Sequence, residues 1–111
     1  MATYGDLKGV KDRLGMPVTD SKQDDTLTRG LNWGSNFIQA MLAANGVTVP
    51  ASAASGTLLG DATCDLAAYY FHRNLKPDVA SLFRTDALSV LSAYIDGERG
   101  IGTFQRTSRE M

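Results

Sequence analysis

Cysteine and histidine, the residues that most often build metal and redox sites, are almost absent from this sequence. Cys64 and His72 are each the only residue of their kind among 111. A single cysteine excludes an intrachain disulfide and a CxxC zinc knuckle. A single histidine excludes a paired-histidine zinc site such as HExxH within one chain.

An excess of charge of either sign and long apolar runs are also lacking. Eleven Lys and Arg face twelve Asp and Glu, a net charge of −1, so no basic field exists to hold nucleic acid nonspecifically. No run approaches the ~18 apolar residues of a membrane span. Residues 1–8 lack the apolar core of a secretory signal. We therefore expect a protein made in a reducing cytoplasm, with no membrane partner.

What is present is the composition of one globular domain. Hydrophobic residues make up 43% and charged residues 21% of the chain, which are ordinary values for a folded protein. At a soft prior of roughly 150 residues per domain, 111 residues make one domain with one core.

Apolar residues recur at spacings of three and four, which predicts an all-α fold, a small four-helix bundle. The predicted helices span residues 4–14, 22–44, 58–75 and 79–95. Thr3 is the expected N-cap of the first helix and Asp78 that of the fourth. Gly15 and Asn45-Gly46 are the expected stops of the first two helices.

Two glycines interrupt the second predicted helix. Gly30 and Gly34 each cost up to about 1 kcal/mol relative to Ala inside a helix. Either they permit close approach of another helix, or they mark a tolerated irregularity or kink. The sequence does not decide between these alternatives.

Two segments lie outside the predicted helices. The loop 46–56 carries no charge and is long enough to be either a binding loop or a connector; a hairpin, an arm and a disordered span all stay open. The segment 98–111 has few apolar residues and is expected to be an extended tail ordered by contact with a partner. The chain thus divides into a helical domain, 1–97, and a tail, 98–111.

The sequence offers weak catalytic or metal-binding candidates. Asp61 and Asp65 share a helix face with His72, a partial metal constellation, but carboxylates are also favoured in the first turns of a helix by its dipole. Cys64 has no evident base or cation beside it, so we expect a buried or inert thiol and not a nucleophile.

Other patterns of chemistry are missing. Gly97, Gly100 and Gly102 do not form G-x-G-x-x-G and follow a helix instead of a strand, and no G-x-S-x-G nucleophile elbow occurs. We therefore predict no enzyme and no cofactor.

Contact with a protein partner is the better-supported expectation. Arg and aromatic residues are favoured at interface hot spots, and the tail contains both. The candidate interface residues are Arg99, Ile101, Phe104, Arg106 and Arg109 of the tail, with Val47 and Val49 of the loop.

The order of these segments resembles the head–tail connector (adaptor, or head-completion) proteins of tailed bacteriophages and prophages. Four stretches over residues 4–97 carry the resemblance: Tyr4–Val10, the acidic pair of Asp24–Leu27, the Ala- and aromatic-rich Leu66–Phe71, and Val90–Gly97 with its terminal glycine. The family has no catalytic motif.

The resemblance implies a structural virion protein at the head–tail interface, assembled in the host cytoplasm. It implies a homo-oligomeric ring, typically of about a dozen subunits closed by rotation, seated on the portal protein. The ring would extend the DNA channel without binding the DNA specifically and would dock the tail, stopper or tail-terminator protein. Adaptor and neighbouring head-completion proteins are not distinguished by these features.

Two alternatives stay open. One is a small helical DNA-binding or regulatory protein with a helix-turn-helix, although Arg84 is the only basic residue of the predicted helix 79–95. The other is a small enzyme or metal protein that uses Asp61, Asp65 and His72.

Overall fold

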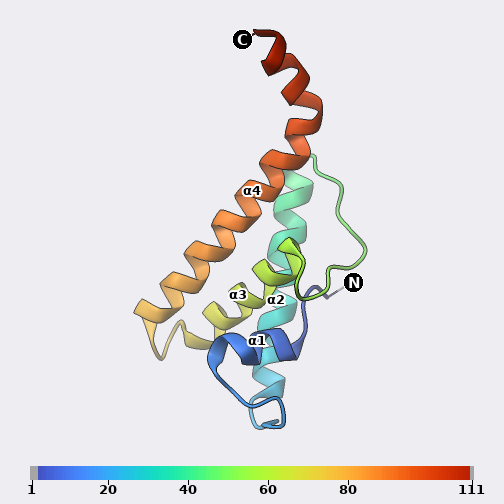
Figure 1. The fold of residues 1–111 in the computed structure, drawn as a ribbon. Helices are drawn as coiled ribbons and strands as arrows, with labels where there is room; N and C mark the ends of the chain where they lie inside the picture. The colour runs from blue at the N-terminus through green and yellow to red at the C-terminus, as the bar shows by residue number, and fades with distance from the viewer. Residues whose placement is uncertain (1–2, 111) are drawn as a thin grey trace.

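The computed structural model describes the backbone of residues 3–110 and the side chains through Glu98. Across residues 3–110 the fold is all helical, without strands, so the predicted helical bundle is confirmed (Figure 1). The helices are α1 (Leu7–Leu14), α2 (Asp24–Ala44), α3 (Leu58–His72) and α4 (Pro77–Glu110).

Helix α1 begins later than predicted. Asp6 is its N-cap, and the Asp6 carboxylate accepts a hydrogen bond from the Gly9 amide at 2.8 Å. The predicted cap, Thr3, was wrong: its hydroxyl bonds Asn32 of α2 instead. The extended residues before α1 are fixed from the side by α2, since the Tyr4 amide donates to Ser35 Oγ at 2.7 Å. Gly15 ends α1 as predicted, with a φ of 71°.

The two glycines of α2 lie where α3 crosses it. A Cβ built on Gly30 would stand 3.2 Å from the Ala67 carbonyl oxygen, and one on Gly34 would stand 3.1 Å from Leu66 Cβ. These separations are at or below the close limit of carbon packing. Close helix approach, not a kink, therefore accounts for both glycines.

The core has two parts on either side of this crossing. The larger part joins α2, α3 and α4 with the N-terminal Tyr4 and the loop residue Val47. The smaller part joins α1, α2 and α3 through Val10, Leu27, Leu31, Cys64 and Ala67. Buried side chains of the larger part include Tyr4, Ile38, Leu42, Val47, Leu59, Leu66, Leu91 and Ile95.

The C-terminal boundary differs most from expectation. The last helix was predicted to end at residue 95 and to be followed by an extended tail, 98–111. Both predictions were wrong, because α4 continues to Glu110. Residue 111 lies outside the described residues. Gly97 does not adopt the left-handed conformation that would stop the helix, and no proline follows Pro77. In Figure 1, α4 runs well past the ends of the other helices. Helix α3 shows the opposite change and ends at His72, before the predicted 75.

The segment between α2 and α3 is an irregular loop tied to the chain's beginning. The Tyr4 hydroxyl donates to the Pro50 carbonyl at 2.5 Å, and the Gly5 amide donates to the Ala53 carbonyl at 2.7 Å. The loop is thus neither a hairpin nor a free arm. The loop leaves the end of α2 near the point where α4 projects and runs along the side of the bundle to the start of α3 (Figure 1).

Candidate functional site

The two acids of the suspected metal constellation both pair with one arginine of another helix. Arg13 of α1 bonds Asp65 Oδ1 through Nε at 2.5 Å and lies 3.4 Å from Asp61 Oδ1 through its terminal nitrogen. Burial raises the pKa of Asp65 despite the opposing effect of Arg13. This ion pair favours the structural interpretation of both acids. Among the described residues no three metal-ligating side chains cluster.

Arg13 was not identified from the sequence. It stands 52 positions before Asp65, and no local spacing pattern joins residues so far apart. Its place is set by α1, where its guanidinium also donates to the Gly9 carbonyl. The ion pairs of Arg13 with Asp61 and Asp65 therefore connect α1 to α3.

His72 is engaged with aromatic rings, not with the two acids. Its ring stacks on Phe83 of α4 with centroids 6.2 Å apart and meets Phe71 edge-on. Within the described residues its Nδ1 is buried without a hydrogen-bond partner. Burial lowers the pKa of His72, and the nearby Lys76 lowers it further. Both causes disfavour the imidazolium.

Stability should therefore fall on mild acidification. With a pKa below the ordinary 6.5 in the folded chain, His72 binds its proton more readily when unfolded, so the free energy of unfolding drops as pH falls from about 7.5 to 5.5. Urea titrations across this range measure the slope. The variant His72→Gln should flatten it, and an unchanged slope would contradict the assignment to His72.

Cys64 is confirmed as a buried thiol. It is fully inaccessible, and its Sγ lies 3.8 Å from the Asp6 carbonyl oxygen. A Cβ on Gly9 would come within 2.7 Å of that sulfur, so α1 and α3 are packed directly through it. A thiol in this setting has a packing role.

The loop and tail candidates separate in the structure. Val47 was wrong as an interface residue, because it is 8% exposed and belongs to the core. Val49 is 37% exposed and stays accessible. The five tail candidates lie on the backbone of α4, but their side chains fall outside the described part of the chain. They are Arg99, Ile101, Phe104, Arg106 and Arg109.

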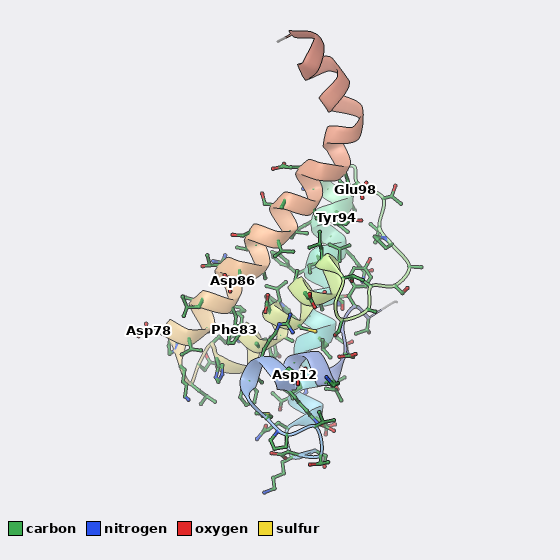
Figure 2. The ribbon with its side chains drawn as sticks, viewed as in Figure 1. Asp12, Asp78, Phe83, Asp86, Tyr94 and Glu98 are labelled. Atoms are coloured by element: carbon green, nitrogen blue, oxygen red, sulfur yellow. The ribbon has the colours of Figure 1, made fainter. Side chains whose placement is uncertain are left out.

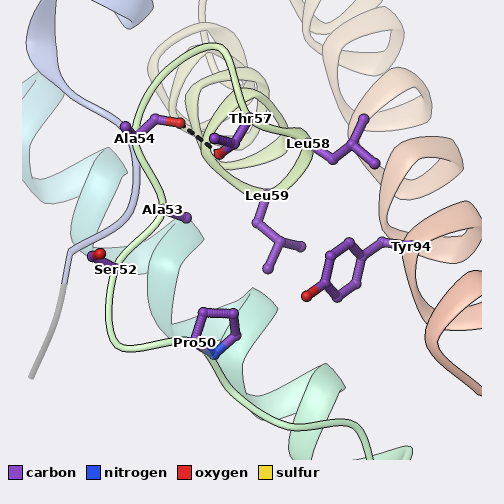
Figure 3. Close-up of a pocket in the computed structure, with 8 residues that line it drawn as sticks. All are labelled: Pro50, Ser52, Ala53, Ala54, Thr57, Leu58, Leu59 and Tyr94. Carbon is purple, nitrogen blue, oxygen red and sulfur yellow. Dashed lines mark hydrogen bonds between the residues drawn. The ribbon is translucent and has the colours of Figure 1, made fainter.

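An apolar groove of about 440 Å³ lies between the loop, the start of α3, and α4 (Figure 3). We call it the loop–α4 groove; its lining residues are Pro50, Ser52, Ala53, Ala54, Thr57, Leu58, Leu59 and Tyr94. In Figure 3 Pro50 and Leu59 lie on one side and Tyr94 projects from α4 on the other. None of these side chains is charged, so the groove suits apolar side chains better than an ionic ligand.

One wall of the groove is kept in place by its own hydrogen bonds. The Thr57 hydroxyl caps α3 by accepting from the Gly60 amide and donates to the Ala54 carbonyl at 2.6 Å. Leu58, the first residue of α3, is left 57% exposed at the groove. Sequence periodicity missed this groove because two segments distant in sequence form it, residues 50–59 and the turn of α4 that carries Tyr94.

A second apolar surface lies at the α3–α4 turn. Leu75 and Leu82 are 71% and 67% exposed, with Val79 between them 38% exposed. In Figure 1 this turn lies at the opposite end of the described part of α4 from the projecting segment. Each end of the bundle therefore exposes apolar side chains.

Charge is distributed unevenly along α4. Residues 85–98 hold Asp86, Asp96 and Glu98 and no Lys or Arg, whereas residues 99–110 hold three arginines and one glutamate. Figure 2 shows Asp78, Asp86 and Glu98 along the helix. The helix is acidic where it belongs to the bundle and basic where it leaves it.

These features give surfaces for contact. Within residues 3–110, every helix is too short or too polar to cross a membrane. No family model, no curated protein and no solved structure matches this chain.

Proposed function

We propose that this protein is a structural connector subunit that forms a ring on the portal vertex of a tailed phage or prophage. The ring continues the DNA channel and docks the tail or stopper protein. The sequence resemblance over residues 4–97 supports this proposal. The observation that carries it is the 34-residue α4, which runs past the ends of the other helices and carries the basic segment 99–110 away from the bundle (Figure 1).

A projecting helix suits a subunit whose work is contact. A small bundle covers little surface by itself, whereas a protruding segment reaches a neighbour or the portal. Residues 99–110 contain two glycines and three β-branched residues, all poor helix formers. A helix of such composition depends on packing against a partner.

Native mass spectrometry of the chain co-expressed with a candidate portal protein tests the proposal. We expect a discrete ring of copies on the portal, and loss of that ring when the chain is cut after Gly97. The cut leaves both core clusters intact, so the truncated chain should retain cooperative thermal unfolding. A full-length chain that stays monomeric in the presence of the portal protein would overturn the connector role. A salt-dependent shift of duplex DNA by the chain would then favour a DNA-binding protein.

A further inference from the structure

The loop–α4 groove lies at the end of the bundle where the basic segment of α4 begins. Its lining is uncharged, and Leu58 and Tyr94 present apolar surface to it (Figure 3). A volume of about 440 Å³ falls within the range of about 300–1,000 Å³ typical of occupied ligand pockets. Exposed apolar surface of this kind marks a contact site.

The charge beside the Tyr94 wall of the groove identifies the charge of its occupant. Glu98 hydrogen-bonds Tyr94, which lines the groove. On the other rim, Asp61 accepts from the Gly56 amide beside Thr57 and is already paired with Arg13 of α1, so Glu98 is the carboxylate that can attract a further cation. No Lys or Arg occurs in residues 30–72 or 85–98, the segments that build this end of the bundle. A basic segment with apolar anchors fits these surroundings.

The chain itself contains such a segment. Residues 99–110 carry three arginines against one glutamate, and Ile101 and Phe104 stand three positions apart on the helical backbone. Residues at this spacing share one helix face, which is the pattern of an amphipathic helix that lies in a groove. In its own chain α4 carries this segment away from the bundle (Figure 1).

We infer that the loop–α4 groove binds the segment 99–110 of a second copy of this chain. The contact joins different surfaces of the two copies, so it repeats from copy to copy and closes into a ring if the rotation permits. The inference rests on the proposed function and names the subunit contact of that ring. Ile101 and Phe104 supply the apolar anchors, and an arginine of the segment pairs with Glu98.

Disulfide trapping between two differently tagged populations tests this contact. In a Cys64→Ala background, one population carries Ser52→Cys in the groove and the other carries Gln105→Cys in the segment. Under mild oxidation we expect the mixed disulfide dimer to form severalfold faster than with Ser81→Cys, a matched serine that is exposed near the start of α4. Equal rates with both serine positions would overturn the inference.

Two further variants separate the apolar and ionic parts. Phe104→Asp should abolish the trapped dimer, and Arg106→Glu should slow its formation. Arg29→Glu, at an exposed site on α2, is the charge-reversal control and should leave the rate unchanged. A chain carrying both Ser52→Cys and Gln105→Cys that closes only within itself at every concentration would show that the segment folds back, which also overturns the inference.

Failure here is distinguishable from failure of the connector role. A ring on the portal without the Ser52–Gln105 disulfide would refute the subunit contact and leave the proposed function standing. If the disulfide forms but the chain does not bind the portal, the subunit contact stands and the connector role is refuted.

Discussion

Replacing Gly60 with alanine is expected to lower the free energy of unfolding by about 3 kcal/mol, near the upper end for an overpacked site. The loop backbone crosses the first turn of α3 directly above Gly60. A Cβ there would overlap the Ala54 carbonyl oxygen and stand 2.5 Å from the Ala54 carbonyl carbon and 2.9 Å from the Ala53 oxygen. These are backbone atoms that cannot rotate aside. Urea denaturation followed by circular dichroism measures the loss.

Gly97→Ala is the matched control, since it makes the same change inside a helix. Beyond its chain neighbours and the nearby backbone of its own helix, no atom of the described residues lies within 4 Å of the Cβ it would add, so α4 should gain up to about 1 kcal/mol of local helix stability. Helix propensity alone predicts the same gain at Gly60. A stabilised Gly60→Ala variant would therefore refute the tight crossing of the loop over α3.

Removing the partner of a buried lysine is expected to have a comparable effect. The Lys11 side chain is only 4% exposed, and its ammonium lies 2.8 Å from Asp24 Oδ1 and donates to the Val18 carbonyl. Asp24→Ala leaves that charge buried without its counterion, which costs about 3 kcal/mol. Thermal or urea unfolding measures the loss, and adding Lys11→Met should recover most of it.

Asp25→Ala controls for the second contribution of Asp24, which is the interaction of its carboxylate with the dipole of α2. Asp24 and Asp25 both lie in the first turn of α2, where a carboxylate stabilises the helix by about 0.3–1 kcal/mol through the dipole. Asp25 is exposed, so its removal should cost only that amount. Equal losses from the two variants would mean that the Lys11 ion pair contributes nothing.

Local sequence signals located the helices but misplaced several of their ends. Gly15 and Asn45-Gly46 act where they were predicted because a left-handed glycine stops a helix by its own geometry. Thr3 failed as a cap because Ser35 of α2 holds the neighbouring Tyr4 amide in an extended segment. Asp96-Gly97 failed as a stop because Gly97 is also compatible with a helix, and nothing packs there to end it.

For the candidate sites too, local sequence signals were sufficient at some residues and tertiary contacts decided the others. That Cys64 is a buried thiol could be predicted, because the neighbouring sequence offers no base or cation to activate it. The partners of Asp61 and Asp65 could not, because Arg13 comes from α1, and Lys11 gave no sign that it would be buried. Val47 was predicted as a surface residue from a loop that carries no charge, but its amide bonds Leu42 and its side chain joins the core.

The sequence by itself determined a single all-helical domain without a disulfide or a paired-histidine metal site, because composition and a period of 3.6 residues are properties of the local chain. Only the tertiary structure decided the role of the two α2 glycines, the groove beside Tyr94 and the projection of α4 beyond the bundle. Each of these depends on segments that meet only after folding. Spacing along the chain does not specify which backbone segment will lie against Gly34, or at which residue α4 extends beyond the helices that pack against it.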